Sequence, residues 1–208
     1  MNDRRKCLIC NKVGKKIYSL KMKSSQLNFF FLNYYVNKQL VKKFLSKIKN
    51  YKYTLLKCHD CKFIWQKYSL KSKLQTELYD KLISQKKSLE KSKKNLKIFK
   101  KMYNLEFSLF KKINYKKNFK ILDYGAGWGS WILSLNHDSK NIFALENSKK
   151  RINYLKMKRI NVISFDYLKK KQTKFDFIRL EQVLEHIEDF DYVFKNFRKI
   201  LNKDRLIY

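Results

Sequence analysis

The sequence predicts an α/β protein with a parallel sheet in its C-terminal half, and two observations carry that prediction. From Phe119 onward, short apolar runs alternate with segments whose apolar residues recur at helical spacing. Three of the four glycines in the chain, Gly125, Gly127 and Gly129, stand at alternate positions between the first apolar run and a helical segment. Alternating strands and helices connect by right-handed crossovers, so we expect the strands to be parallel.

Five strands are expected in this half, with helices between them. The strands are predicted, in chain order, at FKILDYG (119–125), NIFALEN (141–147), NVISFD (161–166), FDFIRLEQ (175–182) and DRLIY (204–208). The helices are predicted at SWILSLNH (130–137), at SKKRINYLKMK (148–158) with Ser148 as its N-cap, and at VLEHIEDFDYVFKNFRKIL (183–201).

Composition and hydrophobic pattern divide the chain into three regions. Residues 1–68 hold all four cysteines and many aromatic residues, and we expect a zinc-ribbon-like module there. Residues 69–117 are rich in lysine, with apolar residues at helical spacing, and are expected to form a helical connector or cap. Residues 118–208 form the predicted α/β domain.

The charge of the chain is strongly positive. The formal net charge is +33 across 208 residues, of which 44% are hydrophobic. Such a balance suits nucleic acid or an anionic membrane surface. The lysines, however, are spread along the chain and far outnumber the arginines, which favours background composition over function. A nucleic-acid partner therefore stays possible but is not favoured.

No targeting or membrane segment is expected. The N-terminus lacks the apolar run of a signal peptide. The most apolar stretch, LNFFFLNYYV (27–36), is too short to span a bilayer. These features predict a cytoplasmic protein, and they leave its oligomeric state unknown.

The four cysteines form two C-x-x-C pairs. Cys7 pairs with Cys10, and Cys58 pairs with Cys61. This spacing lets two thiolates grip one tetrahedral Zn²⁺, so a structural zinc site is predicted. A redox pair and a decayed site without metal are the alternatives. The 47 residues between the pairs include a helix predicted at NYYVNKQLVKKFLSKI (33–48), and His59 is interpreted as a knuckle residue.

The glycine cluster lies where a strand turns into a helix. Without Cβ atoms, the backbone there turns sharply and lets a ligand approach closely. The helix that follows presents free N–H groups to a nucleotide-like ligand. A tight turn that binds no ligand is the alternative.

The arrangement D-x-G-x-G-x-G, from Asp123 to Gly129, resembles motif I of class I S-adenosylmethionine-dependent methyltransferases. Glu146 after the second strand, Asp166 after the third, and the V-L-E-H segment after the fourth follow in the order of that family. The resemblance covers residues 118–208 and implies a Rossmann-like fold that binds S-adenosylmethionine. In the family, the residue at Glu146 accepts hydrogen bonds from the ribose hydroxyls, and the residue at Asp166 meets the adenine amino group. The cofactor-binding residues it implies are Asp123, Gly125, Ala126, Gly127, Gly129, Glu146, Asn147, Asp166 and Glu181.

Each acidic position also has a simpler interpretation. Asp123 would fix the loop by bonding backbone amides, Glu146 would serve NAD equally well, and Asp166 would be a helix N-cap. Some bacterial members of the family carry an N-terminal zinc module of this kind, and several act on sugars or related small metabolites.

The reaction that the resemblance implies is transfer of a methyl group to a small-molecule or sugar acceptor. His186 is the candidate base, because its ordinary pKa lies near neutrality, and Glu185 is the second candidate. Gln182 replaces the first glutamate of a metal-binding E-x-x-E-H segment, so no metal is predicted there. A nucleic-acid methyltransferase or binder, and a non-catalytic zinc-stabilised interaction module with a vestigial cofactor site, are the alternative functions.

The predicted sheet is shorter than the seven strands of that family. The chain stops at Tyr208, within the expected fifth strand, where Asn202, Lys203 and Asp204 replace the family's usual turn. We therefore expect a fragment, a truncated reading frame or half of a split protein.

Overall fold

The computed structural model describes residues 1–208 except 23, 36, 114–118, 136–138, 171–172 and 208. The chain divides into two compact units, Met1–Gln85 and Lys86–Tyr208. The division falls inside the stretch 69–117, so residues 69–85 belong to the first unit and residues 86–113 to the second.

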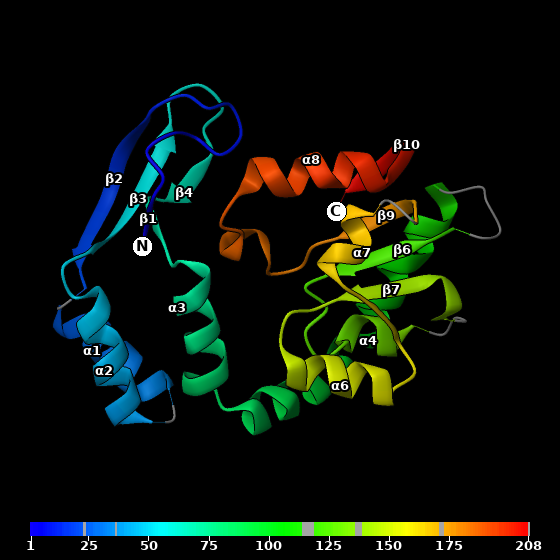
Figure 1. Cartoon of the computed structure of the whole chain (residues 1–208), viewed down its shortest axis with the longest axis horizontal. Coiled ribbons are helices and arrows are strands. Elements are labelled where there is room, and N and C mark those ends of the chain that lie inside the picture. The colour runs from blue at the N-terminus through cyan, green and yellow to red at the C-terminus, as the bar shows by residue number, and fades with distance from the viewer. Residues whose placement is uncertain (23, 36, 114–118, 136–138, 171–172, 208) are drawn as a thin grey trace. The chain divides into compact units, whose positions relative to one another are not determined.

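The second unit is built on a five-stranded sheet whose paired strands are all parallel (Figure 1). The strands are, in chain order, β6 (Ile121–Tyr124), β7 (Ile142–Leu145), β8 (Asn161–Ile163), β9 (Phe175–Arg179) and β10 (Leu201–Ile207). Their spatial order is β8-β7-β6-β9-β10. This is the order of the first five strands of a doubly wound sheet, and it confirms the predicted fold class. The order reverses between β6 and β9, so the crevice that such sheets offer to ligands lies at the carboxyl ends of these two strands.

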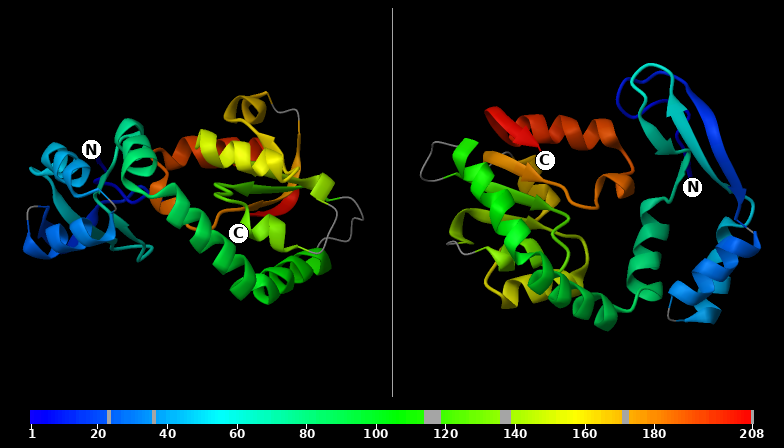
Figure 2. Two further views of the ribbon diagram at one scale, coloured as in Figure 1. Left: turned by 90° about the horizontal axis from the view of Figure 1, so that it is seen from below. Right: turned by 180° about the vertical axis from the view of Figure 1, so that it is seen from behind.

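Helices cover both faces of this sheet. They are α4 (Gln85–Ile113), α5 (Ser130–Ser134), η2 (Ser139–Asn141), α6 (Lys149–Met157), α7 (Phe165–Lys169), η3 (Leu184–His186) and α8 (Phe190–Ile200). Side chains of α4, α5 and α6 share one buried cluster, and those of α7 and α8 share another. Figure 2 shows the long helix α4, in green, running alongside the sheet.

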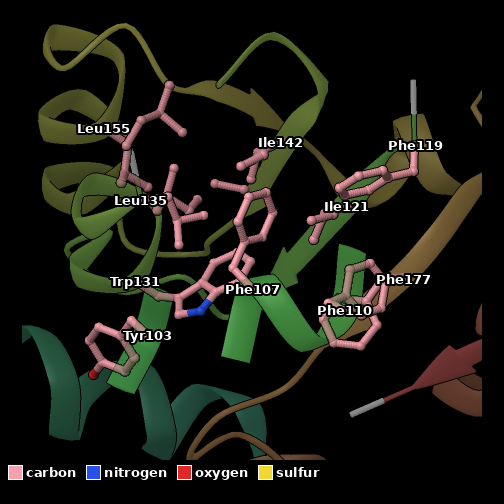
Figure 3. Close-up of a cluster of buried hydrophobic side chains, with 13 residues drawn as sticks. Tyr103, Phe107, Phe110, Phe119, Ile121, Trp131, Leu135, Ile142, Leu155 and Phe177 are labelled. Atoms are coloured by element: carbon pink, nitrogen blue, oxygen red, sulfur yellow. The ribbon is translucent and has the colours of Figure 1, made fainter. Parts of the chain in front are cut away.

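Aromatic side chains fill the cluster beneath α4 (Figure 3). The ring of Phe107 meets the ring of Trp131 edge to face at 6.2 Å between centroids, and Phe110 lies against Phe177 of β9. Such pairs each contribute about 0.5–1.5 kcal/mol beyond the burial of their surface. The lysine-rich helix is therefore fixed to the sheet by its apolar stripe, as the helical spacing predicts.

Two predicted boundaries in this unit are wrong. The helix expected over 183–201 is the short 3₁₀ turn η3 followed by α8, which begins at Phe190. The Asp189 side chain accepts a hydrogen bond from the backbone N–H of Tyr192 at 2.9 Å, and this cap starts the helix. The last strand begins at Leu201 rather than at Asp204, and its pairing with β9 shifts register between Leu201 and Leu206.

The caps of two other helices differ from expectation. Ser148 occupies the N-cap position of α6, but its side chain makes no capping hydrogen bond. Ser164, and not Asp166, caps α7 by accepting a hydrogen bond from the N–H of Tyr167 at 3.2 Å. The helix expected from Ser130 ends at Ser134, and Asn136 and His137 lie outside the described residues.

The first unit combines small antiparallel sheets with helices. A three-stranded sheet holds β2 (Gly14–Lys21), β3 (Lys52–Cys58) and β4 (Ile64–Gln66), and a second sheet pairs β1 (Asn2–Asp3) with β5 (Tyr68–Ser69). The helices are α1 (Ser25–Tyr34), α2 (Lys38–Ile48), α3 (Ser72–Glu77) and the π-helix η1 (Leu78–Leu82). Leu70, Leu74, Leu78 and Leu82, which step by four along the chain, all pack into the core of this unit.

The helix predicted over 33–48 is two helices. The side chain of Asn37 accepts hydrogen bonds from the backbone N–H groups of Gln39 and Leu40, at 3.1 and 3.0 Å. This cap begins α2, whereas α1 ends at Tyr34. Asparagine is a strong N-cap residue, and the helical periodicity on either side masks that signal.

Among the described residues, none of the helices is both long enough and apolar enough to cross a lipid bilayer.

Candidate ligand site and metal centre

The glycine loop runs from the end of β6 to the start of α5. The N–H groups of Gly125 and Ala126 both donate to the carbonyl of Leu145, at 2.8 and 3.1 Å, which ties the loop to the end of β7. Gly125, Gly127 and Gly129 all have positive φ angles, of 79°, 60° and 74°. Residues with a Cβ adopt this region at a cost, so the backbone itself explains why glycine recurs here.

The three glycines face different surroundings. A Cβ on Gly125 would lie 2.5 Å from Cγ2 of Val183, and one on Gly129 would lie 2.6 Å from Cδ2 of Leu155. A Cβ on Gly127 would meet nothing closer than a backbone oxygen at 4.0 Å. Packing therefore requires two of the glycines, whereas the space above Gly127 is open and fits the close approach of a ligand.

This difference predicts different effects of adding a methyl group. Gly129→Ala is expected to destabilise the fold by about 2–4 kcal/mol, because it overpacks a buried contact and strains φ. Gly127→Ala is expected to cost only about 1–2 kcal/mol, from φ alone, while weakening ligand binding more than its stability loss explains. Urea unfolding and calorimetric titration of both variants check this. Equal stability losses would contradict the packing difference.

Helix α4 and helix α6 hold the glycine loop from outside. The indole Nε1 of Trp128 donates to the hydroxyl of Ser88 at 3.0 Å, and the hydroxyls of Ser130 and Ser92 lie 2.5 Å apart. The guanidinium of Arg151 lies 5.7 Å above the Trp128 ring. The loop is thus preorganised by side chains of the elements around it.

Glu146 lies next to the loop, at the end of β7. Its Oε2 accepts a hydrogen bond from the N–H of Gly127 at 2.9 Å, and Oε1 accepts from the N–H groups of Asn147 and Ser148 at 2.8 and 3.0 Å. Arg151 Nη1 lies 3.6 Å from Oε2. A carboxylate offers about four acceptor positions. With three of them taken, it accepts a second hydroxyl only by giving up an existing bond.

Asp123 and Glu181 meet at a buried arginine. Arg179 Nη1 lies 3.4 Å from Oδ1 of Asp123, and Nη2 donates to Oε2 of Glu181 at 2.5 Å. Burial raises the pKa of the Asp123 carboxyl to about 6, although the neighbouring guanidinium favours the ionised form. The interpretation of Asp123 as a simple loop brace is therefore replaced by an ion pair with Arg179 on the adjacent strand.

The remaining predicted residues also lie at the carboxyl ends of the strands. Asp166 is exposed in the first turn of α7, directly after β8, and Asn147 is exposed after β7. His186 ends η3, and its Nε2 lies 3.9 Å from Oε1 of Glu185. Burial lowers the pKa of His186, against the upward effect of Glu185. This shift favours the neutral form of the imidazole, whose side chain is 48% exposed.

The four cysteines gather in one cluster in the first unit. Their Sγ atoms all lie within 4.8 Å of one another, and the shortest separations are 3.4 Å for Cys7–Cys61 and 3.4 Å for Cys10–Cys58. Tetrahedral zinc with Zn–S bonds of about 2.3 Å places its sulfurs roughly 3.8 Å apart, so the cluster fits that ion. His59 does not belong to this cluster among the described residues.

Both cysteine pairs have the backbone geometry of a zinc knuckle. Asn11 and Lys62, which directly follow the second cysteine of each pair, adopt left-handed φ angles of 61° and 62°. Asparagine tolerates that conformation well, whereas a lysine there indicates that the surrounding structure imposes it. The two turns hence point all four sulfurs to one place.

Sequence reasoning missed Arg179, Glu106 and Arg151. Glu106 lies on α4 and accepts a hydrogen bond from Nε of Arg179 at 2.7 Å, across 73 residues of chain. One signal was present: Arg179 is the one basic residue of a strand that is otherwise apolar except for Asp176. A buried charge needs a partner, so a basic residue in such a strand predicts acidic neighbours without saying which ones.

Comparison with known proteins gives a family match that covers the whole second unit and the end of the first. Residues 73–208 match the family described as "Methyltransferase domain". The chain is 29% identical over 99 residues to the ubiquinone biosynthesis O-methyltransferase of Pelagibacter ubique (strain HTCC1062), an alignment that covers 44% of this chain and 41% of that protein.

Solved structures of low identity are also similar. The plantazolicin methyltransferase BpumL in complex with SAH has a TM-score of 0.49 and 14% identity, covering 64% of this chain and 54% of that one. A SAM-dependent methyltransferase from Bacteroides fragilis in complex with S-adenosyl-L-homocysteine has a TM-score of 0.35 and 23% identity, covering 42% and 40%. This chain spans less than two thirds of the length of each of these relatives.

Proposed function

The chain belongs to the family of S-adenosylmethionine-dependent methyltransferase domains, and on that premise we propose that it transfers a methyl group from S-adenosylmethionine to a small-molecule acceptor, sugars included. The observation that carries the proposal is the open glycine loop at Gly127, with the Glu146 carboxylate beside it. Both lie at the carboxyl edge of the parallel sheet, where such sheets bind ligands.

The bound cofactor supplies an activated methyl group on a sulfonium. The residues of the chain bind it, orient it and exclude water. We propose that Glu146 holds the ribose, that Asp166 meets the adenine, and that the backbone from Gly125 to Gly129 carries the remainder of the ligand. Asp123, two residues before Gly125, and Glu181, in the loop after β9, are held together by Arg179.

His186 is our proposed base for an acceptor hydroxyl. It ends η3, the 3₁₀ turn that follows β9, and its lowered pKa favours the neutral imidazole that a general base needs. Glu185 beside it is the second candidate.

Calorimetric titration with S-adenosylhomocysteine, with NADH as a competing ligand class, tests the proposal. We expect saturable binding of S-adenosylhomocysteine with one site per chain and no heat from NADH. Preference for NADH would overturn the assignment, because an acidic residue at the end of the second strand suits either ribose. No binding by a chain with native circular dichroism would favour the vestigial-site alternative.

The acceptor is proposed as a small molecule. The curated relative is named as an O-methyltransferase of ubiquinone biosynthesis, which makes a hydroxyl acceptor a reasonable first screen. A nucleic-acid acceptor is the alternative, since the net charge of +33 would attract it. Binding to an oligonucleotide that weakens steeply with salt would support that alternative.

We further propose that the cysteine cluster binds one structural Zn²⁺. Cys7, Cys10, Cys58 and Cys61 would each donate a thiolate, which fills the tetrahedral shell and leaves no open position for catalysis. Cysteines that serve as zinc ligands have to stay reduced, so we propose a reducing compartment, the cytoplasm.

A further inference from the structure

Arg179 joins three elements at the ligand edge of the second unit. It is the last residue of β9, its neighbour across the sheet is Asp123 of β6, and its side chain is only 5% exposed. Nε contacts Glu106 of α4, Nη1 contacts Asp123, and Nη2 contacts Glu181 in the loop after β9. One planar guanidinium with five donors reaches all three carboxylates, which an ammonium group does not.

Aromatic rings as well as carboxylates fix the position of the Arg179 side chain. Its guanidinium lies 4.8 Å from the ring centre of Trp131 and 5.6 Å from that of Tyr103, so aromatic faces fix its plane. Although burial lowers it, Asp123 and the other carboxylates raise the pKa of Arg179 above its ordinary value. The guanidinium therefore stays charged at every pH at which the protein folds.

The cluster carries more negative than positive charge. Three carboxylates surround one guanidinium. Exposure is graded across them, because the Asp123 side chain is 3% exposed, Glu106 16% and Glu181 45%. Glu181 is the most exposed of the three carboxylates. The excess negative charge of the cluster is therefore closest to solvent there, at the edge of the sheet where the ligand crevice lies.

We infer that Arg179 is a positioning residue, which holds Asp123 and Glu181 as a fixed anionic wall that favours a positively charged ligand over a neutral one. The inference rests on the proposed function, because the methyl donor carries a sulfonium charge that its product lacks. A wall of this kind would bind the donor in preference to the product, and so promote product release.

The test compares two ligands that differ in charge at one place. S-adenosylhomocysteine has a neutral sulfur there, and sinefungin has a protonated amine. Calorimetric Kd values for both are measured between pH 5 and 8 in the full chain. We expect the wild-type chain to prefer sinefungin, and that preference to shrink as pH falls through about 6, where Asp123 takes up a proton. The groups that face Asp123 are Arg179, Glu106, Glu181 and the Tyr103 phenol, and of these the phenol stays neutral over this range.

Two variants and one control test whether the carboxylates held by Arg179 set the preference for the charged ligand. Arg179→Lys is expected to weaken binding of both ligands at least tenfold and to move the pH transition upward, because the buried Asp123 loses its partner. Glu106→Gln is expected to reduce the preference for sinefungin several-fold while leaving S-adenosylhomocysteine within twofold. Arg198→Lys, on the exposed side of α8, is the matched control and is expected to match the wild type.

The binding data distinguish a failure of the proposed function from a failure of the inference about Arg179. If the wild-type chain binds neither ligand, the proposed function fails and the inference falls with it. If the wild-type chain binds both, but Glu106→Gln keeps the full preference for sinefungin, the inference alone is overturned. Should Arg179→Lys not fold, Glu106→Gln still decides, because it keeps a hydrogen-bond acceptor beside Arg179.

Discussion

Glu146→Gln is expected to weaken S-adenosylhomocysteine binding by about a hundredfold or more. The reason lies in what surrounds the carboxylate. Backbone N–H groups of Gly127, Asn147 and Ser148 all point at its two oxygens, so both oxygens must be acceptors. Glutamine offers one acceptor oxygen and turns an NH₂ group toward an N–H or toward the Arg151 guanidinium.

The expected size follows from the bonds that are lost. Hydrogen bonds to a charged group each contribute about 1.5–3 kcal/mol. The variant loses the bond from the one ribose hydroxyl that the remaining acceptor position would take, and it removes the charged acceptor of the Gly127 N–H, so two such bonds are affected. A loss of about 3 kcal/mol corresponds to roughly a hundredfold change in Kd. The loop itself is also expected to loosen, since Gly127 loses its partner.

Calorimetry on the variant measures the effect, and thermal unfolding reports the accompanying change in stability. Asp191→Asn, on an exposed position of α8, removes the same charge away from the residues that hold the glycine loop and serves as the control. An affinity of Glu146→Gln within threefold of the wild type would show that the ligand is not held by this carboxylate.

The glycine loop was predictable because its determinants are local. Chirality makes positive φ costly for any residue with a Cβ, so three glycines at alternate positions are enough to indicate a turn of this kind. The strand that precedes the loop and the helix that follows it are predicted by periodicity in the same short stretch. The two cysteine pairs were predictable for a similar reason, because each knuckle is a local turn around a fixed spacing.

The Arg179 cluster was not predictable, because its partners are set by tertiary structure. Asp123 lies 56 residues away and Glu106 lies 73 residues away along the chain. Nothing in the helical stripe of α4 distinguishes Glu106 from its other polar residues. Only the docking of α4 on the sheet, through Phe107 and Phe110, brings that carboxylate to β9.

The wrong helix boundaries at α2 and α8 have a common physical cause. The side chains of Asn37 and Asp189 cap the N-termini of α2 and α8. Both residues lie inside stretches whose hydrophobic periodicity predicts one continuous helix. Hydrophobic spacing reports which face of a segment is buried, and it does not report where the backbone turns. Capping residues carry that information, and they need to be weighed against the periodicity on both sides.

Loss of the metal is expected to unfold the cysteine-bearing sheet of β2, β3 and β4 in the first unit and to spare the second unit. The core around the cysteines is small: its buried members are Cys7, Leu56, Cys58 and Trp65. A core of this size does not hold a module together alone, whereas structural zinc contributes roughly 10–16 kcal/mol in isolated zinc modules. The sheet of the second unit has two large clusters of its own and needs no such support.

The measurement is hydrogen exchange on the full chain, before and after chelation, together with the zinc content per chain. We expect one zinc per chain in the wild type. After chelation, amide protection should be lost in β2 and β3 and retained in β6 and β9. Cys58→Ser is expected to lower zinc content at least tenfold and to reproduce the exchange pattern of the chelated wild type, because Cys58 is 1% exposed and supplies one of the four clustered sulfurs.

His59→Asn is the matched control for Cys58→Ser, since it alters the neighbouring residue of the same knuckle and leaves all four sulfurs in place. It is expected to keep one zinc and full protection. Loss of zinc in His59→Asn would make the histidine a ligand after all. Unchanged protection in the chelated wild type would mean that the small cysteine core is stable without metal, and the knuckle turns at Asn11 and Lys62 would then need another source of support.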